Sequence, residues 1–470
     1  MNPTKIAKRE LLGGLPKEWP RDLLPEIQDQ VRSVGQKVVV LDDDPTGTQT
    51  VYGIPVLTHW SVDALETELN TRHSGFYILT NSRSMTVREA CHLNYEIGTN
   101  LKAASQKTGV DIEFISRSDS TLRGHFPDEV DALAEALDAV GCPYLIVPCF
   151  FEGNRYTIND IHYVAENDVM TPAAETAYAR DAVFGYCHSN LKKWVEEKTQ
   201  GRISRHQVVT LSLEDIRRGG PEKVRNILWE LVSGSVCVVN AASYRDLEVV
   251  VQGLLEAEDQ GCRFLFRTAA SFVRVRCGIE PRILLESRDV ITDNGCGGLF
   301  VVGSYVPKTT QQVKALINAD QAMAIEIDVI QLLDTGQRAQ EIERVIATMN
   351  KSIGEGVDTV IYTSRKLSSG RDSAHSLKIG KQVSDSLVQI IAALDHQPRY
   401  LVAKGGITSS DVATAGLGVR RAMIIGQILP GVPVWKLGDE ARYPGMAYIV
   451  FPGNVGGKNA LVQIEECLKS

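Results

Sequence analysis

The chain has 470 residues, of which 43% are hydrophobic and 23% are charged, and its net charge is −8. This length exceeds one ordinary hydrophobic core, so we expect two domains. The acidic balance argues against a general nucleic-acid-binding protein, which would present a basic surface. Nine cysteines stand without a Cys-x-x-Cys pair, which is typical of reduced thiols in a cytoplasmic protein and argues against a disulfide framework or a zinc site. We find no secretory leader and no apolar run long enough to span a membrane.

Residues 1–35 are expected to form a mostly helical extension, since Leu23, Leu24, Ile27 and Val31 recur at helical spacing. Beyond them, short apolar runs alternate with longer helical patterns. Strands are predicted at 37–41, 53–57, 76–80, 112–116, 144–148, 207–211, 236–240 and 263–267, and helices at 63–72, 86–106 and 128–140.

A stretch rich in Pro, Gly and charge, 278–298, marks a domain boundary near residue 285. A second alternating series follows, with strands predicted at 299–303, 324–328, 359–363, 399–403, 432–436 and 447–451. We therefore expect an α/β protein with two α/β domains, 36–285 and 286–470, largely parallel sheets and an inter-domain cleft. Ligands in such folds bind at the carboxyl ends of strands, and clefts between domains are common ligand sites.

Three adjacent aspartates, Asp42–Asp44, follow the first strong strand, and Thr46 and Gly47 complete the turn. A helix cap would explain one aspartate, but three in a row must stay solvated or find cations. We therefore favour a function for this turn. An aspartate here can accept a proton from a hydroxyl or hold a divalent cation, while Thr46 and Gly47 can offer a hydroxyl and a backbone N–H.

Two arginine-containing turns follow later strands. Arg83, in the turn 81–84, is either an ordinary surface arginine or a fork for a carboxylate. The turn 116–125 is more specific, because it combines two arginines, Asp119, two hydroxyls and a glycine before a predicted helix. A capped helix start would explain its polarity. An arginine in a first turn opposes the helix dipole, however, so we favour an anion site at this helix N-terminus. The segment 150–160 that follows the strand at 144–148 is expected to be a polar binding loop.

Three glycine-rich turns follow strands in the second half: Gly303–Ser304, Gly405–Thr408 and Pro452–Gly457. Small residues, backbone N–H donors and a helix start are what a phosphate site needs. Each turn alone is weak evidence, and none is a Walker A loop. Three in one domain together favour phosphate binding.

These motifs resemble those of the four-carbon acid sugar kinase family, also known as DUF1537. Pro45 and Ile407 depart from the usual pattern, which has Phe and an acid there, and indicate a subfamily. The extension 1–35 lies outside the resemblance. The matching motifs are Asp43–Gly47, Ser82–Arg83, Ser118–Gly124, Gly303 and Ser304 with Thr309 and Gln312, Lys404–Ser409, Leu429–Val434 and Pro452–Gly457.

The resemblance implies a sugar-acid-binding N-terminal domain and an ATP-binding C-terminal domain. It implies a cytoplasmic, ATP- and Mg²⁺-dependent kinase that phosphorylates a hydroxyl of a four-carbon sugar acid such as threonate, erythronate or an oxo-tetronate. No nucleic acid or membrane partner is expected, and the resemblance is compatible with a homodimer. Two alternatives remain: a Mg²⁺-dependent aldolase or hydrolase whose aspartate run holds the metal, and a non-catalytic sugar-acid-binding protein.

The resemblance also assigns residues. The general base would be Asp43 or Asp44, and no metal ligand is assigned. The sugar acid would lie against Thr46, Gly47, Ser82, Arg83, Asp119, Ser120, Thr121, Arg123 and Gly124. ATP would lie against Ser304, Gly405, Gly406, Thr408, Gly453, Asn454, Gly456 and Gly457.

Overall fold

The computed structural model describes residues 5–291, 295–303, 306–319, 322–364, 373–453 and 455–469. The chain divides into two compact units, residues 1–54 with 59–281, and residues 55–58 with 282–470. Residues 55–58, which the sequence analysis placed in the first domain, group with the second unit. The cause is strand pairing, since β3 (Ile54–Leu57) lies beside β17 (Arg421–Leu429) in the sheet.

The first unit is built on a parallel sheet whose strands are continuous apolar runs. Both faces of the sheet are covered, and Val38 to Leu41 are at most 3% exposed, as expected for strands of a parallel sheet. The chain passes from β2 to β4 on one side and then to β5 on the other, so the topological switch point lies between β2 and β5. In sheet order the strands are β10 (Val209–Leu211), β11 (Val236–Val239), β6 (Tyr144–Val147), β12 (Leu265–Thr268), β5 (Ile112–Arg117), β2 (Lys37–Asp42) and β4 (Gly75–Leu79).

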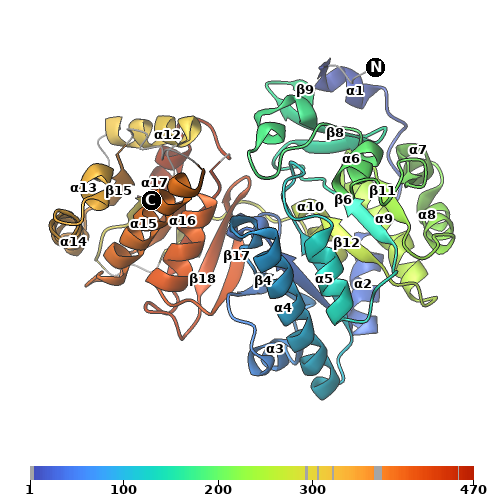
Figure 1. The fold of residues 1–470 in the computed structure, drawn as a ribbon, viewed down its shortest axis with the longest axis horizontal. Helices are drawn as coiled ribbons and strands as arrows, with labels where there is room; N and C mark the ends of the chain where they lie inside the picture. Colours follow the sequence, from blue (N-terminus) through green and yellow to red (C-terminus); the bar gives the residue numbers. More distant parts are fainter. Residues whose placement is uncertain are drawn as a thin grey trace. The chain divides into compact units, whose positions relative to one another are not determined.

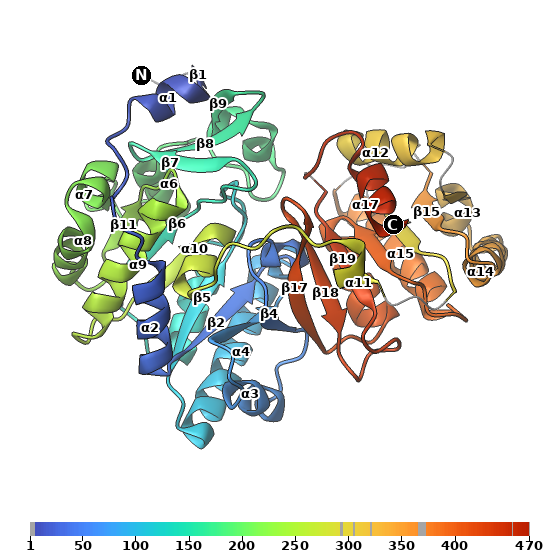
Figure 2. The ribbon, with the colours of Figure 1, turned by 180° about the vertical axis from the view of Figure 1, so that it is seen from behind.

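Two groups of helices cover this sheet (Figures 1 and 2). Helices α3 (Val62–Leu69), α4 (Val87–Thr108) and α5 (Asp128–Ala136) lie on one face, and α2 (Leu24–Val34), α9 (Tyr244–Glu258) and α10 (Ala270–Arg276) lie on the other. Helix α4 starts at a capping box of Thr86 and Glu89 and ends at Gly109, whose φ of 68° suits glycine. The remaining helices of the unit are α1 (Lys8–Gly13), α6 (Leu191–Lys198), α7 (Leu213–Arg217) and α8 (Gly220–Trp229).

An antiparallel sheet that the sequence analysis did not predict follows β6. It consists of β7 (Arg155–Ile158), β8 (Ile161–Glu166), β9 (Val169–Pro172) and, from the N-terminal extension, β1 (Ile6–Ala7). Both hairpin turns are Asn-Asp pairs, 159–160 and 167–168, with φ between 47° and 62°. Two consecutive positive φ values are what a type I′ turn requires. The expected polar loop at 150–160 therefore contains strand β7, with turns on either side of it, and the extension contributes a strand as well as helices.

The second unit holds a mixed sheet. Its strands run parallel from β19 to β14, while β18 is antiparallel to its two neighbours, β17 and β19. From β13 the chain goes to β14 and β15 on one side and then to β16 on the other, so the switch point lies between β13 and β16. In sheet order the strands are β17, β18 (Val432–Leu437), β19 (Ala447–Phe451), β16 (Leu401–Lys404), β13 (Leu299–Val302), β15 (Thr359–Thr363) and β14 (Met323–Ile327). Its helices are α11 (Ser287–Val290), α12 (Pro307–Asn318), α13 (Val329–Leu333), α14 (Arg338–Gly354), α15 (Ser373–Ala392), α16 (Gly406–Asp411) and α17 (Ala460–Lys469).

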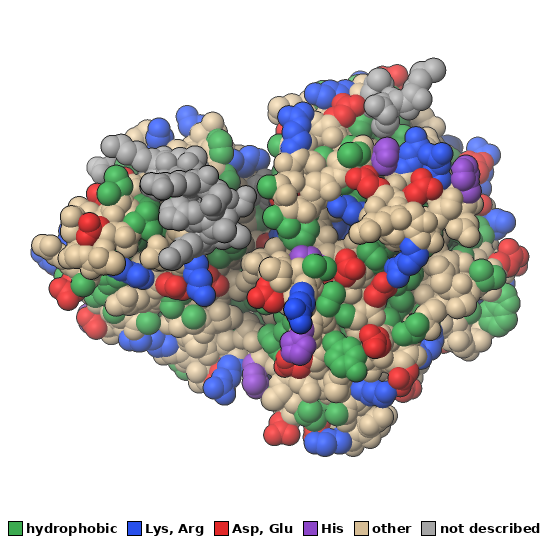
Figure 3. Space-filling view, viewed as in Figure 1, with side chains coloured by type: hydrophobic (Ala, Val, Ile, Leu, Met, Phe, Trp, Pro, Cys, Tyr) green, Lys and Arg blue, Asp and Glu red, His purple; other side chains and the backbone are tan. Residues whose placement is uncertain are grey.

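The surface mixes charges of both signs. On the face drawn in Figure 3, acidic and basic side chains alternate over each unit. Among the described residues, none of the helices has the length and apolar character needed to cross a bilayer.

Candidate functional site

Asp42 and Arg117 form a buried ion pair at the switch point of the first unit, at the ends of β2 and β5. Asp42 Oδ1 lies 2.9 Å from Arg117 Nη1, and both side chains are at most 4% exposed. Gly47 passes directly over the pair, since a Cβ there would lie 2.1 Å from Asp42 Oδ2 and 2.3 Å from Arg117 Nη1. Burial raises the pKa of Asp42 to about 7. The pair therefore supports the turn from below, and only glycine fits above it.

Asp44 is engaged by its own turn. It caps the short 3₁₀ helix Pro45–Thr48, and its Oδ1 accepts hydrogen bonds from the Thr46 N–H at 2.8 Å and the Thr46 hydroxyl at 2.5 Å. Its other oxygen pairs with Arg83. Burial alone would raise the pKa of Asp44, but the Arg83 guanidinium and the Thr46 hydrogen bonds outweigh it and hold this pKa below its usual value. The capping role considered from the sequence thus accounts for Asp44.

Asp43 differs from Asp42 and Asp44 in that neither of its carboxylate oxygens accepts a hydrogen bond from any residue that the structure describes. Its side chain is 3% exposed. The nearest cationic nitrogens are Arg117 Nη1 at 3.7 Å and Arg83 Nη1 at 3.8 Å. Gly124, with a φ of 121°, approaches so closely that a Cβ would lie 3.3 Å from Asp43 Oδ2. Burial raises the pKa of Asp43 above its usual value, despite the two guanidinium groups.

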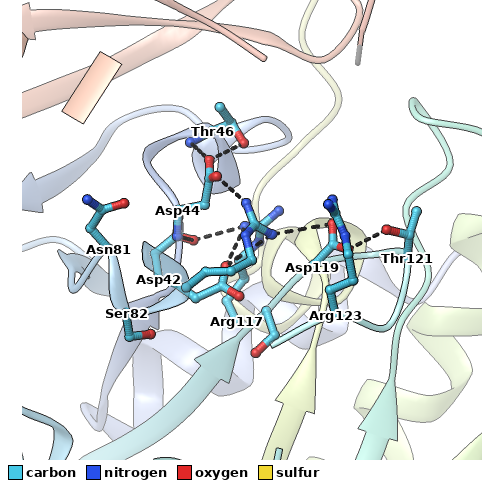
Figure 4. Close-up of polar contacts among 12 residues, drawn as sticks. Asp42, Asp44, Thr46, Asn81, Ser82, Arg117, Asp119, Thr121 and Arg123 are labelled. Carbon is cyan, nitrogen blue, oxygen red and sulfur yellow. Dashed lines mark hydrogen bonds and ion pairs between the residues drawn. The ribbon is translucent and has the colours of Figure 1, made fainter. Parts of the chain in front are cut away.

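Charges of opposite sign alternate along the site (Figure 4). Arg83 Nη1 lies 3.4 Å from Asp119 Oδ1, and Arg123 Nε lies 2.8 Å from Asp119 Oδ2. The Thr121 hydroxyl also donates to Asp119. Burial acts to raise the pKa of Asp119, but Arg123 and then Arg83 outweigh it and hold this pKa well below its usual value. Asp44, Arg83, Asp119 and Arg123 therefore form one continuous row of ionised groups.

The loop that carries Arg123 is not the first turn of a helix. Helix α5 begins only at Asp128, and its first turn carries three acidic residues. Arg123 therefore lies in the loop before the helix, where it pairs with Asp119, and not in the first helical turn. Anion binding by this loop stays a prediction. The loop bends through Leu122, with a φ of 70°, and Gly124.

Buried polar residues that the sequence analysis did not assign hold the turns in place. Glu129 accepts hydrogen bonds from the hydroxyls of Ser82 at 2.9 Å and Ser118 at 3.2 Å, and burial raises its pKa to about 7. Ser82 is 1% exposed, so its hydroxyl faces Glu129. Arg267, at the end of β12, donates from Nη2 to the carbonyl oxygens of Asp119 at 2.9 Å and Arg123 at 3.0 Å. A signal for Arg267 was present, since its predicted strand ends at the same edge of the sheet.

In the second unit, two of the glycine-rich turns lie at the switch point. Gly303 follows β13, and a Cβ on it would lie 2.5 Å from the Thr408 hydroxyl in α16. Gly405 follows β16 with a φ of 113°, and Gly406 starts α16. The first N–H groups of this helix therefore open at the carboxyl ends of parallel strands, where such folds bind ligands.

The third glycine-rich turn is anchored through its carbonyl oxygens. The Gln312 amide donates to the carbonyl oxygens of Val455 at 3.1 Å and Gly457 at 3.0 Å, and the buried Lys404 ammonium donates to Pro452 at 2.5 Å. Gly456 has a φ of 81°, and Gly453 opens the turn. The expected ligands Ser304 and Asn454 lie outside the described residues.

The aspartate run does not form a metal cage. Within the described ranges, no group of three or more His, Cys, Asp or Glu side chains is arranged to hold a metal ion. Asp42, Asp44 and Asp119 each have a guanidinium partner instead.

Comparison with known proteins agrees with this division of polar motifs. Residues 38–276 match the model of a sugar-binding N-terminal domain, and residues 299–461 match that of a nucleotide-binding C-terminal domain. The chain belongs to the four-carbon acid sugar kinase family. The extension that precedes residue 38 lies outside both matched regions.

Two curated relatives of this kinase family are distant. The chain is 27% identical over 319 residues to a D-erythronate kinase of Heliobacterium modesticaldum, which is 66% of each chain. It is 22% identical over 230 residues to a 3-oxo-isoapionate kinase of Paraburkholderia graminis, which is 46% of this chain and 47% of that one. The matched segments thus span less than two thirds of either relative.

Two solved structures share the fold. A protein from Salmonella typhimurium LT2 has a TM-score of 0.66 at 18% identity, with 91% of this chain and 98% of that chain covered. A DUF1537 protein from Haemophilus influenzae has a TM-score of 0.61 at 18% identity, with 92% and 100% covered. At this identity they establish the two-domain α/β fold alone.

Proposed function

We propose that this protein is an ATP-dependent kinase that phosphorylates a hydroxyl of a four-carbon sugar acid of the threonate, erythronate or oxo-tetronate type. The observation that carries the proposal is Asp43, a buried carboxylate that accepts no hydrogen bond from the described residues and lies between the guanidinium groups of Arg83 and Arg117. The names of the two curated kinases support the same reaction class.

The row of alternating charges suits a polyhydroxy acid. Such a substrate needs cations for its carboxylate and acceptors for its hydroxyls, and Arg83 and Arg123 offer the cations. Asp119 stays ionised at every physiological pH because its pKa is held well below the usual value. It therefore serves as the acceptor for substrate hydroxyls. Thr46, Gly47, Ser120, Thr121 and Gly124 line the turns around it, whereas Ser82 supports the site through Glu129.

Asp43 is the proposed general base. Its raised pKa makes it a better proton acceptor than an ordinary aspartate, and neither of its oxygens is committed to a hydrogen bond with the described residues. Asp44 is proposed to orient Arg83 and the turn, because its own oxygens are already hydrogen-bonded. The base abstracts the hydroxyl proton as the oxygen attacks the γ-phosphorus of ATP, and ADP leaves.

The glycine-rich turns of the second unit are proposed to hold ATP. Gly406, Gly453, Gly456 and Gly457 would provide backbone N–H groups, and Thr408 a hydroxyl, for its phosphates. The Gly405 N–H already donates to the Phe451 carbonyl oxygen at 2.9 Å, so Gly405 would serve by letting the backbone come close to the phosphates. Gln312 and Lys404 tie the carbonyl oxygens of the third turn, which leaves its N–H groups for the nucleotide. Mg²⁺ would neutralise phosphate charge, held mainly by phosphate oxygens and water, as is usual for this ion.

The test is ADP release with ATP and Mg²⁺ against a panel of four-carbon sugar acids. The proposal expects turnover with at least one of them, and loss of turnover in Asp43→Asn. Turnover of a sugar acid without ATP would support the aldolase or hydrolase alternative, which the guanidinium-paired aspartates make less attractive. Saturable binding without turnover would support the non-catalytic alternative. The cytoplasmic location and the homodimer stay predictions.

A further inference from the structure

The N-terminal extension contacts the antiparallel sheet of the first unit. Strand β1 pairs with β9, Ile6 opposite Met170 and Ala7 opposite Val169, and the Lys8 N–H donates to the Asp168 carbonyl oxygen at 2.8 Å. After β1 the chain continues into α1. Several apolar side chains of this segment pack on one face of the sheet, namely Ile6, Leu11, Leu12 and Leu15.

The two faces of this sheet carry different side chains and make different contacts, because successive side chains along a strand point to opposite faces. One face is the apolar one, with Tyr156, Ile158, Tyr163, Ala165 and Met170 all buried under the extension. The residues between them, Arg155, Thr157 and His162, belong to the opposite face. A shift of the strands under the extension therefore moves this second face as well.

The second face contacts the loop that carries Asp119 and Arg123. Burial lowers the pKa of His162 to about 4, so its ring is neutral. Its Nε2 donates to the Ser120 carbonyl oxygen at 2.7 Å, and its Nδ1 accepts from the Thr157 hydroxyl, 3.0 Å away. These contacts tie β7 and β8 to the middle of the loop.

The segment after β9 continues the contact. Asp181 Oδ2 lies 3.4 Å from Arg123 Nη1, and the Tyr186 hydroxyl donates to the Thr121 carbonyl oxygen at 2.7 Å. The Tyr178 ring lies under two guanidinium groups, with its centroid 5.3 Å from Arg123 Cζ and 5.8 Å from Arg155 Cζ. The antiparallel sheet and this segment thus form one wall of the proposed sugar-acid site.

Lys8 joins the extension to this wall at a specific point. Its Nζ donates to Asn154 Oδ1 at 3.0 Å and lies 5.0 Å from the centre of the Tyr156 ring. Asn154 has a φ of 61° and directly precedes Arg155. The ammonium group therefore holds a left-handed residue in the turn that sets the direction of the Arg155 side chain.

We infer that residues 5–15 are a positioning element for sugar-acid binding, which fixes the wall formed by 150–186 against the loop Ser118–Gly124. This inference rests on the proposed function for its kinetic readout. The element does not touch the substrate; it acts through Asn154, His162 and the segment around Asp181. Binding of the sugar acid thus depends on residues outside the family's matched region.

The test compares Lys8→Met and Leu12→Ser with the wild type, and uses Lys17→Met as the matched control. Lys17 is an exposed lysine of the same extension whose side chain makes no hydrogen bond or ion pair with any residue of the described ranges. The inference expects the KM for the sugar acid to rise about fivefold in both variants, while kcat and the KM for ATP change by less than about twofold. Amide hydrogen exchange at 118–124 and 150–172 is expected to become faster in both variants. Lys17→Met should change neither quantity.

A deletion of residues 2–15 extends the series. It stops before Pro16, whose carbonyl oxygen accepts from Arg217 Nη1 at 2.7 Å, and is expected to raise the KM for the sugar acid more than either substitution. The deletion exposes an apolar face of the sheet, so the deletion variant can fail to fold. In that event, the two substitutions Lys8→Met and Leu12→Ser test the inference.

Three outcomes are informative. A lower melting temperature with an unchanged KM for the sugar acid would show that residues 5–15 only shield apolar side chains from water, and would overturn the inference. Unchanged exchange at 118–124 would overturn it as well. A wild type that phosphorylates no sugar acid contradicts the proposed function instead, and the exchange data then decide the inference alone, with faster exchange at 118–124 in its favour.

Discussion

The substitution Asp43→Asn separates chemistry from stability in this site. Asparagine keeps the size of the side chain but cannot accept a proton. General base catalysis contributes about 10²- to 10⁴-fold in rate, or about 3–5 kcal/mol of barrier. We therefore expect kcat to fall by about 10²- to 10⁴-fold, while both KM values change by less than about threefold.

The melting temperature is not expected to fall in Asp43→Asn, although kcat does. Asp43 accepts no hydrogen bond from the described residues, so the substitution breaks none. Its folded pKa is raised above the unfolded value, so the folded state binds more protons than the unfolded state and loses stability as pH rises through the folded pKa. Asparagine removes this loss. The melting temperature of Asp43→Asn at pH 8 should therefore equal or exceed that of the wild type.

The pH profile gives an independent check. Only the ionised carboxylate accepts the proton, so kcat/KM of the wild type should rise with pH up to the raised pKa of Asp43 and then level off. Asp44→Asn is the matched control, because it removes the cap and the Arg83 pair. It should lower the melting temperature and raise the KM for the sugar acid, with a smaller loss of kcat. An Asp43→Asn enzyme that keeps more than about a tenth of kcat would refute the reasoning.

Three further substitutions test the supporting residues. Gly47→Ala should lower the free energy of unfolding by about 2–4 kcal/mol in chemical denaturation, because its Cβ would overlap Asp42 and Arg117; a loss within error would contradict the close approach. Gln312→Ala should raise the KM for ATP about tenfold and leave that for the sugar acid unchanged, since it frees two carbonyl oxygens of the third glycine-rich turn; an equal rise in both would argue against a nucleotide role. Glu129→Gln should flatten the fall in melting temperature that the wild type shows as pH rises from about 4.3 to 7. A folded pKa of about 7 makes ionisation of this buried carboxyl costly by at most about 4 kcal/mol, and glutamine does not ionise. Melting temperatures that fall equally with pH in the two proteins would contradict this.

The sequence predicted the parallel framework because a fully buried strand leaves a continuous apolar run. It also located the polar motifs at the carboxyl ends of strands, since they directly follow such runs at Asp42 and Lys404. The switch points depend on the strand order, which the sequence did not predict. The antiparallel sheet was not predicted, because each of its strands has one polar face and its sequence therefore resembles a polar loop. The Asn-Asp pairs at 159–160 and 167–168 were the available signal, because both take the positive φ of hairpin turns.

Other features of the site depend on side-chain direction, which sequence does not specify. Asp43 and Asp44 are adjacent and chemically identical, and only the fold turns Asp44 toward Thr46 and leaves Asp43 without a hydrogen bond from the described residues. Arg267, Glu129 and His162 act through contacts with residues distant in the chain. Their roles could not be predicted without the tertiary structure.

The most direct measurement is ³¹P NMR of a reaction that contains the protein, ATP, Mg²⁺ and the sugar acid preferred in the panel. The account predicts that the γ-phosphate resonance of ATP disappears as a phosphomonoester of the sugar acid and ADP appear together in equal amounts. Release of inorganic phosphate in place of the phosphomonoester, or persistence of intact ATP with every sugar acid, would contradict it.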